Sequence, residues 1–442
     1  MLIEFRTENH RSLRDEQVLT MAAGRGGDAD DPRIRKVRGF AEPLLPVAAI
    51  YGANASGKTN ILSALAFMKD AVTYSHRSWA PDGGIPRDPF AWGKKDEPSL
   101  FEVTVLVDSV RYQYGFVADN QSIVEEWLYA WPHGKKQVWY ERDHNRFKFG
   151  GNLKGENKRI EEITRPNSLF LSAAVQLKHT QLSGIFYWFG QLRAVHLSPN
   201  VWPLVTQMMI VDLVAELHDP QDQGSLAHPF LAMLRNADLG IVDVDVDIQD
   251  HGKSRGLPHV RCRLKHKSSH GDAWLPLEQE SHGTCQLFQM GIPILQCLKE
   301  GSVLIIDELE SRLHPSLALE IVNLFNDPQK NPRNAQLVFT THDTNLLGTT
   351  RGEPVLRRDQ IWLTEKDSEG ATILYPLTDY KPRNSENLER GYLQGRYGAI
   401  PFLGNFGWGN EASHHDQTPR QRPKTRQTPS VSGSQASAPD RV

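Results

Sequence analysis

The sequence is poor in cysteine and has no long apolar run. Only three cysteines occur among 442 residues, namely Cys262, Cys285 and Cys297. Their number is odd and their spacing fits neither a zinc site nor a disulfide framework, so we expect reduced thiols in a cytoplasmic protein. No apolar run approaches the roughly 20 residues that span a bilayer. Residues 1–6 carry charge too early for a secretory signal peptide.

Strong net charge, internal repeats and long heptad arrays are also missing. The formal net charge is −3, so no overall field favours nucleic acid or an acidic membrane as a partner. The absence of repeats and heptads excludes a solenoid and a long coiled coil. Hydrophobic residues make up 39% and charged residues 23% of the chain. This composition is typical of a globular protein, and the length predicts two or three domains of about 150 residues.

A glycine-rich loop, G-x-x-x-x-G-K-T, occupies residues 52–59. The apolar residues 44–50 before it predict a buried strand, and residues 60–68 after it predict an amphipathic helix, which is the context of a phosphate-binding P-loop. We expect Lys58 to contact the β- and γ-phosphates of a nucleotide and Thr59 to bind Mg²⁺. The predicted nucleotide-binding residues of this segment are Gly52, Asn54, Ala55, Ser56, Gly57, Lys58, Thr59 and Asn60.

Acidic and polar residues follow two further apolar strands. Residues 303–306 predict a buried strand that ends in Asp307 and Glu308, and residues 336–340 predict a strand followed by Thr341 and His342. Asp307 is placed to hold Mg²⁺, Glu308 to activate water as a general base, and His342 to contact the γ-phosphate. A solvated acidic turn is the alternative, which the nearby P-loop disfavours. The predicted catalytic residues are Glu308, His342 and Lys58.

Ser281 and Gly283 precede a helix expected near residues 283–299. A serine, a glycine and a helix N-terminus together make an anion-binding site. Because the P-loop already supplies one such site, we expect Ser281 and Gly283 to contact a nucleotide bound by a second copy of the chain. The sequence therefore predicts a homodimer or a higher even oligomer.

The predicted organisation is an ATPase head over residues 1–410 with an insertion at 76–275, followed by a disordered tail at 411–442 that is poor in aliphatic residues. Within the insertion, alternating runs at 98–150 predict an antiparallel meander. Its aromatic side chains could stack on nucleic-acid bases, but their packing within the sheet is the simpler interpretation. Residues 168–175 predict a buried strand, 178–240 a helical lobe and 241–279 strands. Asp243, Asp245 and Asp247 lie on one face of a predicted strand there. A solvated strand edge is the favoured interpretation of this row, and a metal site is the alternative.

The order of these motifs resembles the ABC-type ATPase head of the SMC, RecF and OLD-like families. Details in residues 9–12, 170–176, 307–315 and 391–401 are most similar to the RloA-like "AAA family ATPase" group of bacterial anti-phage and abortive-infection systems. The resemblance covers about residues 1–404 and implies an α/β P-loop NTPase fold with an antiparallel β subdomain and a helical insertion. It also implies that Gln176 contacts nucleotide and Mg²⁺, that Ser281 and Gly283 act in trans, and that residues 311–314 cross a dimer.

The resemblance implies an Mg²⁺-dependent ATPase that dimerises on ATP and gates a separately encoded effector, with a nuclease as the expected effector. The alternative is a RecF-like repair ATPase that binds duplex DNA across engaged heads, which makes DNA a second candidate partner. No membrane partner is expected. A GTPase is disfavoured because the segment Asn157-Lys158-Arg159-Ile160 has isoleucine where the guanine motif needs aspartate. The sequence also departs from the LSGGQ motif of transporters at residues 281–284.

Overall fold

The computed structural model describes residues 1–24, 30–197, 226–237, 240–249, 259–269, 273–350, 353–383 and 386–401. The predicted tail at 411–442 and much of the predicted helical lobe lie outside these residues. Among the described helices, none combines the length and apolar character needed to cross a membrane. The boundaries predicted for the head, the insertion and the tail stay predictions.

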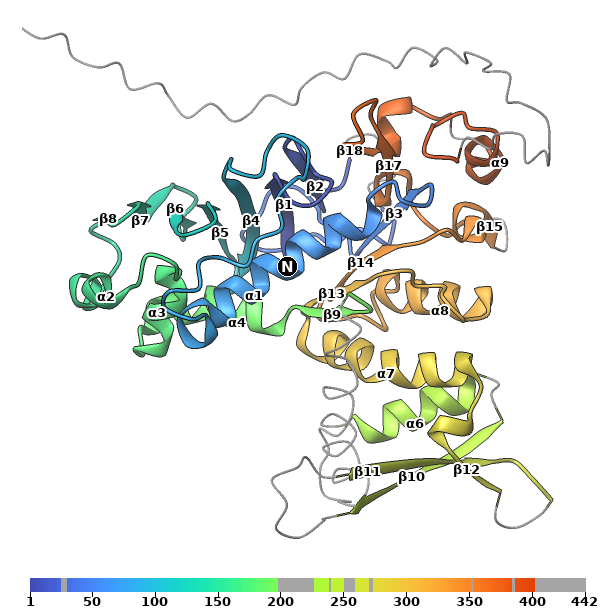
Figure 1. Cartoon of the computed structure of the whole chain (residues 1–442). Coiled ribbons are helices and arrows are strands. Elements are labelled where there is room, and N and C mark those ends of the chain that lie inside the picture. Colours follow the sequence, from blue (N-terminus) through green and yellow to red (C-terminus); the bar gives the residue numbers. More distant parts are fainter. Residues whose placement is uncertain are drawn as a thin grey trace, which may run out of the picture.

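A six-stranded sheet forms the centre of the molecule, in the order β18-β17-β3-β14-β13-β9 (Figure 1). All of its neighbouring strands are parallel except β18, which pairs antiparallel with β17. Parallel strands end at a common edge, so the chain segments that follow them meet there. The strands are β3 (Val47–Gly52), β9 (Arg193–Val195), β13 (Val303–Ile306), β14 (Gln336–Thr340), β17 (Ile361–Lys366) and β18 (Thr372–Pro376).

Side chains of this central sheet alternate between two hydrophobic cores, as the period of two in a strand requires. Ile50 and Ile305 pack with Leu65 of α1 (Lys58–Ser78) in the core on one face. Tyr51 and Ile306 pack into the other core. Helices α7 (His282–Glu300) and α8 (Pro315–Asn326) line that second core. The P-loop strand is thus buried on both faces, which explains its continuous apolar sequence.

The second large sheet is antiparallel and has seven strands in the order β2-β1-β4-β5-β6-β7-β8. The N-terminal strands therefore extend the predicted meander, and Phe101 of this sheet shares a core with α1. The predicted α/β fold with an antiparallel β subdomain is confirmed. Its strands are β1 (Leu2–Glu8), β2 (Gln17–Thr20), β4 (Ser99–Val107), β5 (Val110–Ala118), β6 (Ile123–Trp131), β7 (Gln137–Asp143) and β8 (Arg146–Phe149).

The strand predicted at residues 168–175 is wrong, because this segment forms helix α3 (Phe170–Gln176). A short apolar run has no periodicity that separates a buried strand from a buried helix. The carboxylate of Glu126, fully buried on β6, decides the outcome. It accepts the backbone N–H groups of Phe170 and Leu171 at 2.7 and 3.1 Å. It thereby supplies acceptors to the free N–H groups of the first helical turn.

The helical lobe is also less helical than predicted, since residues 193–195 form strand β9 at the edge of the central sheet. Helices α2 (Asn157–Ile163) and α4 (Thr180–Gln191) flank α3 (Figure 1). Helix α6 (Ala227–Asn236) packs on α7, where Phe230 lies 5.1 Å from Phe288 between ring centroids. Shorter elements near the end of the described chain include β15 (Thr349–Thr350), β16 (Glu353–Pro354) and α9 (Leu388–Leu393).

A small antiparallel sheet joins β10 (Ile241–Gln249), β11 (His259–His266) and β12 (Trp274–Pro276). Its backbone register places the aspartates of β10 opposite basic residues of β11, and Asp245 forms an ion pair with Arg263, a contact that stabilises a strand pair. Among the described residues, no group of three or more His, Cys, Asp or Glu could hold a metal ion. The pairs are Asp243 with Lys265, Asp245 with Arg263 and Asp247 with Arg261.

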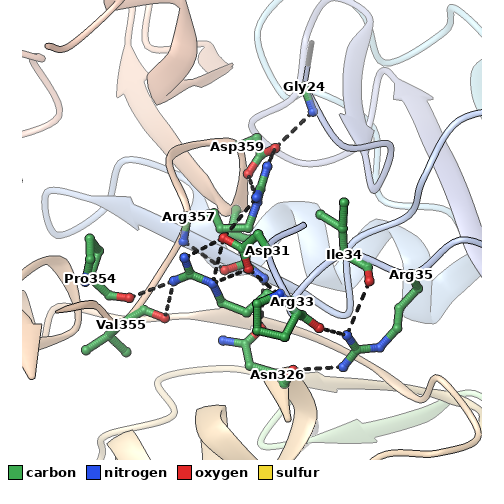
Figure 2. Close-up of polar contacts among 12 residues, drawn as sticks. Gly24, Asp31, Arg33, Ile34, Arg35, Asn326, Pro354, Val355, Arg357 and Asp359 are labelled. Carbon is green, nitrogen blue, oxygen red and sulfur yellow. Dashed lines mark hydrogen bonds and ion pairs between the residues drawn. The ribbon is translucent and has the colours of Figure 1, made fainter. Parts of the chain in front are cut away.

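A partly buried cluster of ion pairs connects the loop before β3 to the segment that leads into β17 (Figure 2). Asp31 forms ion pairs with Arg33 at 2.6 Å and with Arg357 at 3.0 Å. Arg357 also pairs with Asp359 at 2.8 Å, and Asp359 accepts the backbone N–H of Gly24. Because β3 and β17 are neighbours, the cluster joins the two segments that lead into these adjacent strands.

Replacing Glu126 by glutamine should destabilise the fold. The carboxylate also accepts hydroxyl hydrogen bonds from Tyr114 and Tyr140 at 3.1 and 2.8 Å, and lies 3.5 Å from the buried Arg142. Loss of the charge should lower the free energy of unfolding by about 2–4 kcal/mol, measured by urea titration. The matched control is Glu125→Gln at the exposed neighbouring position. Equal stability of the two variants would contradict this role.

Asp31→Asn should weaken the ion cluster. Burial opposes ionisation of Asp31, but Arg33 and Arg357 outweigh it and lower the pKa of this carboxyl from 3.8 to about 2. A depressed folded-state pKa stabilises the protein above the unfolded value, and this stability is lost as pH falls from 3.8 towards 2. The variant should lose about 1–2 kcal/mol at neutral pH and show a shallower acid transition by circular dichroism. Asp82→Asn at an exposed position should match wild type.

Candidate functional site

The predicted P-loop is a tight turn at the edge where the parallel strands end. Ala55 and Gly57 have left-handed φ values of 62° and 100°, and α1 begins at Lys58. A Cβ atom at Gly57 would lie 2.0 Å from the hydroxyl of Thr372. Glycine is therefore required at this position both for its backbone angle and for lack of space.

Hydroxyl groups of the neighbouring β17–β18 hairpin form hydrogen bonds to the P-loop. The Ser56 hydroxyl lies 2.6 Å from the Thr364 hydroxyl, and the Thr372 hydroxyl donates to the Ser56 carbonyl at 2.8 Å. Ser12 bonds to the Thr372 hydroxyl at 2.7 Å and accepts from the Asn60 amide at 2.6 Å. The sequence motifs did not reveal Thr364 and Thr372, because nothing in sequence placed β17 and β18 beside the loop.

Lys58 is buried within the P-loop, with only 6% of its surface exposed. Its ammonium group donates to the carbonyls of Gly52 and Ala53 at 2.9 and 3.2 Å and lies 2.9 Å from Nε2 of His342. Since Lys58 can only donate, Nε2 of His342 accepts and this imidazole is neutral. The structure therefore brings together two of the three predicted catalytic residues.

Burial and charge set the titration of this pair. Burial lowers the pKa of Lys58, while the carboxylates of Asp307, Glu308 and Glu310 act in the opposite direction. Burial and the charge of Lys58 both lower the pKa of His342. The backbone N–H of His342 donates to Glu310 at 2.5 Å. This arrangement holds a neutral imidazole and a cation at one point of the sheet edge.

Asp307 and Thr59, two of the three predicted magnesium ligands, lie in direct contact. The Thr59 hydroxyl donates to the Asp307 carboxylate at 3.0 Å, and Thr340 donates to the same carboxylate at 2.6 Å. A carboxylate and a hydroxyl are the hard oxygen ligands that Mg²⁺ prefers, and one or two carboxylates with phosphates and waters complete such sites. The residues present therefore fit Mg²⁺, whose chemistry is to neutralise charge on the β- and γ-phosphates.

Glu308 lies at the same edge, exposed and with a left-handed φ of 51°. Its backbone N–H donates to the Thr340 hydroxyl at 2.7 Å. Thr340 thus bonds both Asp307 and Glu308, and fixes the acidic pair relative to β14. An exposed carboxylate beside the phosphate-binding loop can accept a proton from water.

Ser281 and Gly283 lie at the exposed start of α7 rather than at the P-loop. Ser281 caps the helix, since its hydroxyl accepts the N–H of Thr284 at 3.1 Å. A Cβ at Gly283 would lie 2.8 Å from the carbonyl of Arg312. The helix start therefore adjoins the loop that follows Glu308. Because α7 runs directly into β13, its N-terminus faces the edge at which the parallel strands end.

Gln176 lies at the end of α3, exposed, and the structure does not bring it to the P-loop. Helix α3 packs on the far part of α1, where the Ser172 hydroxyl accepts the N–H of His76 at 3.2 Å. At 1.5 Å per residue, His76 lies about 27 Å along α1 from Lys58. Four residues from Ser172 to Gln176 cannot span that distance.

His196, which the sequence analysis missed, lies at the end of β9 beside the acidic pair. Its Nδ1 is 3.1 Å from the carbonyl of Asp307, and its Nε2 is 2.8 Å from the amide nitrogen of Gln286 on α7. Burial lowers the pKa of His196. A polar residue at the end of a parallel strand is a usable signal, but residues 193–195 were predicted to be helical.

Comparison with known proteins identifies a matching family. A family model described as "AAA domain, putative AbiEii toxin, Type IV TA system" matches residues 47–174 and 205–348, more than half of the chain. No curated protein matches. The SMC head bound to the C-winged helix domain of ScpA is similar at 11% identity over 85% of this chain and 97% of that chain, with a TM-score of 0.44. The SMC head domain from Thermotoga maritima is similar at 12% identity over 85% and 98%, with a TM-score of 0.38.

Thr340→Val should impair the site without unfolding it. Valine keeps the shape but removes the hydroxyl that donates to Asp307 and accepts from Glu308. We expect Mg²⁺-dependent nucleotide binding to weaken by about tenfold, measured by titration calorimetry with and without Mg²⁺. Thr340→Ser, which keeps the hydroxyl, is the control and should bind like wild type. Wild-type affinity in the valine variant would contradict this assignment.

Proposed function

Because the chain belongs to the AAA-domain family whose model it matches, we propose that it is an Mg²⁺-dependent ATPase that dimerises on ATP. In this proposal the ATP cycle gates a separately encoded effector in bacterial anti-phage defence. The observation that carries the proposal is the convergence of Lys58, Thr59 and Asp307 at one sheet edge. Glu308 and His342 flank the same point.

Each of these residues has a role in the proposed hydrolysis. Lys58 and Thr59 bind the nucleotide phosphates and the metal ion, and Asp307 completes the metal site. Glu308 accepts a proton from the attacking water, and the neutral His342 donates a hydrogen bond to the transferring phosphate. The bond between Lys58 and His342 supports this role for His342, because it holds the imidazole beside the phosphate-binding cation.

The exposed start of α7 supports a nucleotide site completed by a second copy. Gly283 lies against the backbone of Arg312, and both Ser281 and Arg312 are exposed, so the start of α7 adjoins residues 311–314. A helix N-terminus there presents free N–H groups, which bind phosphate oxygens. In the proposed dimer, Ser281 and Gly283 of one protomer contact the γ-phosphate held by its partner. Residues 311–314 lie in the same interface.

The proposed role in defence rests on two findings. The motifs of the RloA-like group occur in the chain, and the description of the matching family model names a toxin of a toxin–antitoxin system. Both findings point to a protein that works with a separately encoded partner. Association of ATP-bound protein with a neighbouring gene product, lost in the ADP state, would support effector gating. ATP-dependent binding to DNA ends without any partner would favour the RecF-like alternative.

Glu308→Gln should bind ATP, fail to hydrolyse it and accumulate as a dimer, because the base is lost while the phosphate contacts remain. Light scattering after size exclusion should show a dimer with ATP and Mg²⁺. Lys58→Ala should stay monomeric under the same conditions because it loses the phosphate contact. Phosphate release should fall at least about 100-fold in both variants. Glu162→Gln at an exposed position is the control. A monomeric Glu308→Gln protein at saturating ATP would overturn the proposed dimer.

A further inference from the structure

Two side chains hold opposite ends of the peptide that joins Asp307 to Glu308. The N–H of this peptide, on Glu308, donates to the Thr340 hydroxyl at 2.7 Å. Its carbonyl oxygen, on Asp307, lies 3.1 Å from Nδ1 of His196. A peptide bond is planar, so two such contacts fix its orientation. Glu308 follows with φ of 51°, an angle that a residue with a side chain adopts at a cost.

The hydrogen-bond partners of His196 define its tautomer. The amide nitrogen of Gln286 can only donate, so Nε2 of His196 accepts this bond. The proton of the neutral ring is then on Nδ1, which donates to the carbonyl of Asp307. Both ring nitrogens are used, each towards a different element. His196 itself has a left-handed φ of 65°, so the chain turns sharply after β9 to present the ring.

Gln286 connects this peptide to the end of α7. It is buried, with 7% of its surface exposed, and lies five residues after the capping Ser281. One helix therefore carries both the exposed anion-binding end and the amide that bonds His196. A helix moves as a stiff rod over a turn or two, so displacement of its first turn also displaces Gln286.

We propose that His196 is a positioning residue that fixes the Asp307–Glu308 peptide and, through Gln286, couples it to the start of α7. This inference rests on the proposed function. Contact of Ser281 with the nucleotide of the partner subunit orders the first turn of α7. Gln286 and His196 then set the direction of Glu308 in the protomer's own site. The dimer would hydrolyse ATP cooperatively, because occupancy of one site prepares the base of the other.

Three substitutions separate the two contacts. His196→Ala removes both of them. His196→Asn keeps the hydrogen bond to the Asp307 carbonyl, because the asparagine amide nitrogen and the histidine Nδ1 are the same number of bonds from Cβ. Asparagine also tolerates the left-handed φ of this position. Gln286→Leu keeps the ring and removes only its bond to α7. Each full-length variant is measured for MgATP affinity, kcat, and the dependence of rate on ATP concentration.

The alanine variant should bind MgATP within about twofold of wild type while kcat falls about 10- to 100-fold, because Glu308 is misplaced. His196→Asn and Gln286→Leu should keep kcat within about threefold, but their Hill coefficient should fall to about 1 from a higher wild-type value. His228→Ala, an exposed histidine on α6, is the control and should match wild type in all three measurements.

An unchanged kcat in His196→Ala would overturn the positioning role, as would equal losses in the alanine and asparagine variants. A wild-type Hill coefficient in Gln286→Leu would overturn the coupling to α7. Should His196→Ala fail to fold, a wild-type Hill coefficient in His196→Asn or Gln286→Leu would still overturn the proposal, because both variants lose the bond to α7. Absence of ATP hydrolysis by the wild-type protein would instead reject the proposed function, so the two failures are distinguishable.

Discussion

The carboxylate of Asp307 is the interaction on which the site depends. It accepts hydrogen bonds from Thr59 at the start of α1 and from Thr340 at the end of β14. Three segments that are distant in sequence thereby meet at one point. The parallel order of β3, β14 and β13 makes this meeting possible, because it places their carboxyl ends together. A slip of one residue in β13 or β14 would turn Asp307 or Thr340 to the opposite face of the sheet.

The packing around α1 keeps that edge in place. The helix lies between the central sheet and the antiparallel sheet, and residues of both sheets share its core (Figure 1). One polar cluster inside this apolar region centres on Glu126, which bonds two tyrosines and the start of α3. The ion cluster of Asp31 and Arg357 connects the segments that lead into β3 and β17 (Figure 2).

Strong local motifs were predictable and long-range partners were not. The strands predicted at 303–306 and 336–340 have those bounds in the structure, whereas the P-loop strand predicted at 44–50 spans Val47–Gly52. The apolar residues 168–175 predict a strand, but they form helix α3 because the start of this helix bonds to Glu126, 44 residues earlier in the chain. Strand β9 was missed because three residues are too few for a pattern, and His196 was missed with it. Gln176 came from resemblance alone, and the structure places it away from the P-loop.

The central claim is that each nucleotide site combines residues of two chains, and mixing two inactive variants tests it directly. Lys58→Ala removes the phosphate contact of one half-site. Ser281→Asp affects the other half-site, where aspartate still caps α7 but repels the phosphate of the nucleotide. A mixed dimer retains one intact composite site, so an equimolar mixture should recover up to about a quarter of wild-type hydrolysis. Activity of the mixture no higher than that of either variant alone would contradict the composite site.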